Sequence, residues 1–167
     1  MNQESVLIKD GFKLFRNKGK LFYKYNITQE ISHPSKQIFL VTIISLDSIK
    51  ILSHKDIFTV MNIILDDIKA NNPKISKETA MTLTILDLRK GVRFVPDIQI
   101  IRKAALQKES ASFITSGGMV IILPENSRRL KRVINEIVRF LAKDRHLLAI
   151  STYEEAMQKL QEFALEN

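Results

Sequence analysis

The chain contains no cysteine. That absence excludes a disulfide scaffold, a thiolate nucleophile and a cysteine-ligated zinc site. Long apolar runs are missing too: stretches such as residues 38–46 are far shorter than the roughly 20 residues that a membrane-spanning helix needs. The opening residues, MNQESVLIKDGF, lack the basic-then-apolar profile and the cleavage site of a signal peptide. We therefore expect a cytoplasmic protein without a transmembrane segment.

Motifs for catalysis and cofactor binding are equally scarce. The sequence has no Walker loop, no G-x-G-x-x-G fingerprint and no G-x-S-x-G elbow. None of its histidines, His33, His54 and His146, is followed three or four residues later by a second metal ligand. We interpret them as structural, with His146 ending a basic helix, and Asp66-Asp67 as a solvated pair. We predict no catalytic residue, no cofactor, no metal ion and no enzymatic activity.

What the chain does have is the composition of a folded protein, with 45% apolar and 26% charged residues. No repeat, low-complexity tract or Pro/Gly-rich linker interrupts it, so we expect a single domain over residues 1–167. Its net charge of +8 is uneven. Residues 128–145 hold seven basic and two acidic side chains, a surplus of five, whereas residues 146–167 hold one basic and four acidic, a net charge of −3. Such a field attracts phosphates or an acidic partner, although the solvated face of a helix explains the same charges.

The first part of the chain is predicted to be a β-hairpin. Two strands are expected within residues 12–27, around turn residues 17–19, Asn-Lys-Gly. With the polar connection 28–36, this hairpin makes up residues 1–36. The remainder, residues 37–165, is predicted to be an α/β core.

Strands and helices are predicted to alternate in that core. Strands are expected at 37–45, 81–88 and 147–151, and helices from Ser53 to Asn72, from Pro96 to about Lys108, over 127–145 and from Thr152 to the end. Ser53 and Ser127 are expected N-caps, and Thr152 with Glu155 forms a capping box. Residues 112–123 contain one strand, in which Gly117-Gly118 makes either a hairpin turn or an irregularity. These elements predict an α/β protein with a mixed, mostly parallel β-sheet and flanking helices.

Two segments carry a resemblance to a known family. A strand ends in an acid at Ile85-Leu86-Asp87-Leu88 and is followed by GVRFVPDIQII over residues 91–101, and the chain closes with LLAISTYEEAMQKL, a strand and a capped helix. Over about residues 38–163 these features resemble the STAS-like, SpoIIAA-like fold of bacterial anti-sigma-factor antagonists, in its divergent STAS/Sec14-like group. The resemblance implies a non-catalytic regulatory module that docks a protein partner. The docking contacts that it implies are Asp87, Lys90, Arg93, Pro96 and Asp97.

The chain departs from that family at the phosphorylation site. Antagonists typically place an Asp-Ser pair at a helix start, where a kinase partner phosphorylates the serine. Here the corresponding residues are Pro96 and Asp97, so the resemblance implies docking without the usual phosphoserine switch. Asp97 stands either as a permanent negative charge or as an ordinary first-turn acid that stabilises a helix.

Two other functions are alternatives to protein docking. One is binding of a small apolar or lipid-like ligand, as in Sec14-like relatives. Its candidate residues, which also fit ordinary core packing, are Phe58, Met61, Ile64 and Phe113. The other is binding of nucleic acid or an anionic membrane, which neither an aromatic stacking platform nor a recognised motif supports. Its candidate contacts are Arg128, Arg129, Arg132 and Arg139. A homodimer is also compatible with the sequence.

Overall fold

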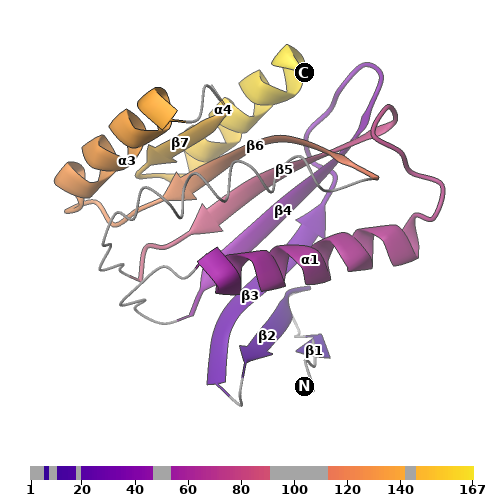
Figure 1. Cartoon of the computed structure of the whole chain (residues 1–167), viewed down its shortest axis with the longest axis horizontal. Helices are drawn as coiled ribbons and strands as arrows, with labels where there is room; N and C mark the ends of the chain where they lie inside the picture. The colour runs from indigo at the N-terminus through magenta and orange to yellow at the C-terminus, as the bar shows by residue number, and fades with distance from the viewer. Residues whose placement is uncertain (1–5, 8–10, 18–19, 47–53, 91–112, 142–145) are drawn as a thin grey trace.

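The protein is built around one mixed β-sheet. The computed structural model describes residues 6–7, 11–17, 20–46, 54–90, 113–141 and 146–167. Seven strands lie in the order of the sequence, from β1 at one edge to β7 at the other (Figure 1). The antiparallel half consists of β1 (Val6–Leu7), β2 (Lys13–Asn17), β3 (Lys20–Thr28) and β4 (Gln37–Ser45). The parallel half continues from β4 through β5 (Ala80–Asp87), β6 (Thr115–Ile122) and β7 (Leu147–Ile150).

The predicted N-terminal hairpin is formed by β2 and β3. Asn17 pairs with Lys20, so the connecting turn consists of residues 18–19, which lie outside the described residues. β3 pairs in turn with β4, and the hairpin therefore extends the sheet of the core. The two-residue strand β1, which the sequence did not predict, adds to its outer edge.

Three helices are described: α1 (His54–Asn71), α3 (Arg128–Leu141) and α4 (Tyr153–Glu166). α1 ends two residues before Pro73, as expected from the constraint that proline places on the residue before it. Ser53 and the predicted helix 96–108 lie outside the described residues. None of the described helices combines the length and apolar character needed to cross a lipid bilayer.

The helices cover both faces of the sheet. Side chains of α1 and α3, such as Ile64 and Ile134, pack against one face, and those of α4, such as Leu160, pack against the other. The β4–β5 and β6–β7 connections step across the sheet in the same direction, so crossovers of the same hand place α1 and α3 on the same face. β5 is buried at all eight positions, as expected of a strand covered on both faces.

Residues 115–122 form one strand, β6, and not a hairpin. The pairing with β5 passes over Gly117, which is therefore the extra residue of a β-bulge. Gly118 has a φ of +151°, and a Cβ atom there would lie 2.7 Å from Cδ2 of Phe163. The glycine pair thus lets the strand bend and lets α4 approach the sheet closely.

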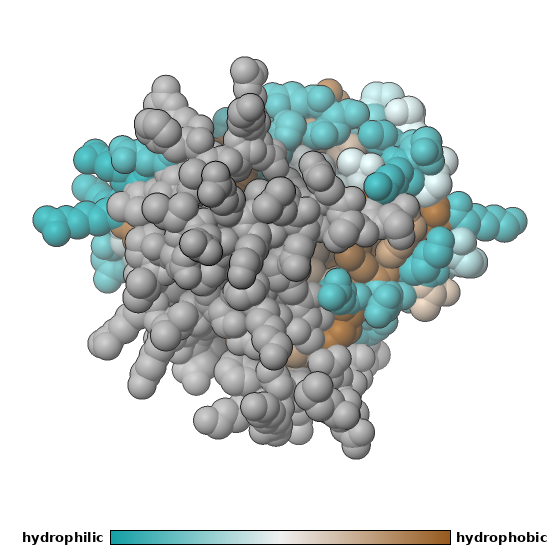
Figure 2. Space-filling view, viewed as in Figure 1, coloured by the Kyte–Doolittle hydropathy of each residue, from teal (hydrophilic) through white to brown (hydrophobic). Residues whose placement is uncertain are grey.

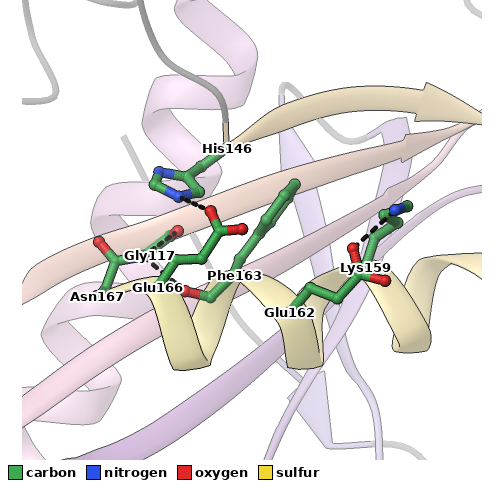
Figure 3. A network of polar contacts seen from close by, with 7 residues as sticks. All are labelled: Gly117, His146, Lys159, Glu162, Phe163, Glu166 and Asn167. Carbon is green, nitrogen blue, oxygen red and sulfur yellow. Dashed lines mark hydrogen bonds and ion pairs between the residues drawn. The ribbon is translucent and has the colours of Figure 1, made fainter.

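Polar contacts fasten the end of α4 to the sheet (Figure 3). The side-chain amide of Asn167 donates to the carbonyl oxygens of Gly117, at 3.2 Å, and Phe163, at 2.7 Å. Nε2 of His146 lies 3.0 Å from Oε2 of Glu166, and the His146 ring meets that of Phe163 edge to face. His146 immediately precedes β7 and has a carboxylate partner on α4. Residues 142–145 lie outside the described residues, so the interpretation that His146 ends a helix stays a prediction.

Partly buried side-chain hydrogen bonds join α1 to the hairpin. Asp67 accepts hydrogen bonds from Nζ of Lys13, at 2.6 Å, and from the hydroxyl of Tyr25, at 2.9 Å. Asp66 is exposed. The interpretation of Asp66-Asp67 as a solvated pair is therefore wrong for Asp67, because the antiparallel half of the sheet places a cation and a hydroxyl beside it.

Candidate functional site

The carboxyl ends of the parallel strands meet at one edge of the sheet, where α/β proteins commonly bind ligands. α3 and α4 start at this same edge, because each follows one of these strands directly. An open cleft of about 450 Å³ lies here. It is lined by Arg89, Pro124, Glu125, Ser151, Thr152, Tyr153 and Glu154. Three separate strand ends, those of β5, β6 and β7, therefore contribute to one surface.

A buried carboxylate, that of Asp87, orients the guanidinium of Arg89 in the cleft. Asp87, the last residue of β5, is only 5% exposed. Its Oδ1 accepts a hydrogen bond from the backbone N of Arg89 at 3.1 Å, which forms an Asx-turn. The guanidinium of Arg89 donates to the same carboxylate, from Nε to Oδ1 at 3.0 Å and from Nη2 to Oδ2 at 2.7 Å. These hydrogen bonds raise the pKa of Arg89, whose side chain is still 53% exposed.

The start of α4 also lines the cleft, through Thr152, Tyr153 and Glu154. Thr152 has extended backbone geometry, and its hydroxyl accepts a hydrogen bond from the backbone N of Glu155 at 3.2 Å. This is the predicted N-cap. Tyr153 follows with 36% of its surface exposed, and Glu154 is exposed beside it. The acids of this first turn suit the positive end of the helix dipole.

The start of α3 has the opposite charge. It begins directly after Ser127, as predicted, with Arg128, Arg129, Lys131 and Arg132 and no acid in its first turn. The three arginines are exposed, and within the described part of the chain no ion pair engages them. Nζ of Lys131 donates to Oγ of Ser151 at 3.3 Å, which connects this helix to the cleft.

Ser151 lines the cleft, and its Oγ accepts a hydrogen bond from Nζ of Lys131. In the described residues, no group of three or more histidine, aspartate or glutamate side chains is arranged to hold a metal ion.

The structure brings together some of the residues that the sequence singled out. Lys90 is exposed next to Arg89, at the same edge of the sheet as the basic turn of α3. Asp87 is buried and reaches the surface only through Arg89. Arg93, Pro96 and Asp97 lie outside the described residues, and of Arg139 only its place in α3 is described.

The candidate residues for an apolar ligand take part in core packing. Ile64 is fully buried, and Met61 and Phe113 pack against the same core. Nζ of Lys69 lies 5.2 Å from the centre of the Phe113 ring, on the outside of that core. The side chain of Phe58 lies outside the described part of the chain.

His33 has a structural place in the fold. Nδ1 of His33 accepts hydrogen bonds from the backbone N of Ser35, at 3.1 Å, and of Lys36, at 3.0 Å, and so closes a turn in the β3–β4 connection. His54 is the first residue of α1.

Sequence reasoning missed Asn135, in the middle of α3. Its side-chain amide donates to the carbonyl oxygen of Ala149 at 3.0 Å, and its Oδ1 accepts from the backbone N of Ala149 at 2.7 Å. β7 is the last strand of the sheet, so Asn135 occupies the hydrogen-bonding groups that a further strand would use. An asparagine is a poor helix former, and its place between apolar residues of a helix was the available signal.

On the face shown in Figure 2, hydrophilic residues make up most of the coloured surface, and apolar residues gather mainly right of centre. Among the large apolar side chains of the described residues, only Tyr153 and Leu165 are exposed, at 36% and 65%. No protein-family model, curated protein or solved structure significantly matches this chain.

Proposed function

We propose that this chain is a non-catalytic interaction module that docks another protein at the carboxyl edge of its sheet, as its resemblance to STAS-like antagonists implies. Arg89 and Tyr153 are the principal contacts, and Asp87 is a positioning residue for Arg89. The observation that carries the proposal is a bidentate interaction: the half-exposed guanidinium of Arg89 donates two hydrogen bonds to the buried carboxylate of Asp87. The exposed Tyr153 lines the same cleft.

Arginine and tyrosine are the residue types that most often dominate the binding energy of protein interfaces. An arginine that is already fixed also loses less conformational freedom on binding. The hydrogen bonds that Arg89 donates to the carboxylate of Asp87 fix its guanidinium before any partner arrives. The cleft supplies recognition groups of both charges, from Arg89, Glu125 and Glu154, which suits it to docking a protein surface.

Site-specific photo-crosslinking tests this proposal in cells that produce the protein naturally. A photoreactive residue in place of Glu125, which lines the cleft, should form a discrete adduct. The same residue in place of Lys77, in the exposed turn before β5, serves as the control and should form none. Arg89→Ala should reduce the Glu125 adduct several-fold, and so should Asp87→Asn, which removes the charge that orients Arg89. Equal adducts from both positions, or an adduct that is insensitive to Arg89→Ala, would contradict docking at this edge.

A further inference from the structure

The first turns of α3 carry a concentrated positive charge that nothing in the described part of the chain neutralises. Arg128, Arg129 and Arg132 are exposed there and make no ion pair with the residues that the structure describes. They lie within five consecutive residues, which span about 6 Å along a helix axis. We infer that this turn is the recognition surface for an acidic segment of the partner protein, an inference that rests on the proposed function.

These charges do not serve the helix itself. Unpaired backbone N–H groups give a helix start a partial positive charge, so cations there reduce its stability. The start of α4, with Glu154 and Glu155, shows the favourable arrangement in the same protein. The unfavourable arrangement in α3 presents arginines that no described acid pairs with, as a site for an external anion requires.

The surroundings favour carboxylates of a protein over a phosphate backbone. Glu125 and Glu154 line the adjoining cleft, and Glu136 is exposed on α3. A continuous polyanion would meet these acids, and the repulsion would cost binding energy. An acidic protein segment presents a few separate carboxylates, which match the planar donors of arginine in pairs.

The arginine turn is also continuous with the cleft. Lys131 lies within the arginine turn and donates to Ser151, which lines the cleft. The connection from Pro124 to Ser127 joins the cleft wall directly to the start of α3. One partner segment that contacts Arg89 in the cleft therefore extends onto the arginines of α3.

The experiment uses the full chain and a fluorescent decaglutamate peptide as the probe. Arg128→Glu/Arg132→Glu should weaken peptide binding at least tenfold, and added salt should weaken binding to the unaltered protein. Lys74→Glu/Lys77→Glu is the matched control, because both double variants lower the net charge from +8 to +4 by two reversals of charge. Lys74 and Lys77 are exposed in the turn between α1 and β5, and their variant should bind the peptide within about twofold of the unaltered protein. Acids at a helix start are favourable, so the α3 variant should retain its fold, as measured by circular dichroism.

The same variants distinguish this inference from the proposed function. If the Arg128→Glu/Arg132→Glu variant loses both peptide binding and the Glu125 photo-adduct, the result supports the inference. An undiminished photo-adduct in that variant overturns the arginine surface and leaves docking in the cleft intact. Peptide binding without any cleft adduct overturns the docking site instead. Tighter binding of a ten-nucleotide DNA or of phosphatidylserine vesicles than of the peptide would show that the anion is a phosphate, and would also overturn the inference.

Discussion

α3 and α4 have equivalent places in the fold, but their starts differ in charge. Each follows the carboxyl end of a parallel strand, and they lie on opposite faces of the sheet. α4 has a threonine cap and two first-turn acids, whereas α3 has arginines and no first-turn acid. The comparison separates two demands on a helix start, the stability of the helix and the binding of a partner. α4 follows the rules of helix stability, and α3 departs from them where we propose that it binds a partner.

The largest expected effect concerns the anchor of α4. Leu160 is fully buried between this helix and the sheet. Leu160→Ala should lower the free energy of unfolding by about 2–5 kcal/mol, because it removes apolar contacts and leaves a cavity. Leu165→Ala, on the exposed side of the same helix, is the control and should change it by less than about 0.5 kcal/mol. Similar losses for both variants in chemical denaturation would show that α4 does not pack as described.

The corresponding test for α3 concerns its polar anchor. Asn135→Ala should lower the free energy of unfolding by about 1–3 kcal/mol, because the backbone N and O of the buried Ala149 lose their partners. The uncovered edge of β7 should also promote self-association, which size-exclusion chromatography would detect. Asn135→Asp retains an acceptor for the backbone N of Ala149 but faces its carbonyl oxygen with a carboxylate, so it should be destabilised as well. A fully stable, monomeric Asn135→Ala protein would refute the edge-protecting role.

A smaller effect is expected at the cap of α4. Thr152→Ala removes the acceptor for the backbone N of Glu155 and should cost about 1 kcal/mol of stability. Thr152→Ser keeps the hydroxyl and should behave like the unaltered protein. Thermal unfolding of the two variants gives the comparison, and an equal midpoint for both would mean that the hydrogen bond contributes nothing.

The smallest effect is the sharpest test of the difference between the two helices. Arg128→Glu should raise the free energy of unfolding by a few tenths to about 1 kcal/mol, because it places an acid at a helix start. Glu154→Lys makes the reverse change in α4 and should lower it by a similar amount. Denaturant titrations at low salt measure both changes, and shifts of the same sign would exclude the helix dipole as their cause.

Much of the fold could be predicted from patterns within single segments. The strand at 37–45 was predicted with the bounds of β4, and the end of α1 and the cap of α4 followed from Pro73 and Thr152. The irregular segment around Gly117-Gly118 could not be assigned, because the choice between hairpin and bulge depends on the pairing with β5. At the candidate site, the sequence identified Asp87 and the arginines of α3, but not the bonding of Asp87 to Arg89 or the exposure of Tyr153.

Hydrophobic periodicity, caps and breakers were sufficient to specify most of the described helices and strands, β1 and the course of β6 excepted, because these signals depend on residues a few positions apart. Contacts between distant segments depend on which strands pair and on which face of the sheet each helix covers. Only the tertiary structure determines both. Lys13 and Asp67 are 54 positions apart, and Asn135 meets Ala149 only because α3 lies beside β7. The cleft has the same origin, since three strand ends that are separate in the chain meet at one edge of the sheet. The spacing of residues in the sequence does not predict such long-range contacts, because they depend on the order and register of the strands.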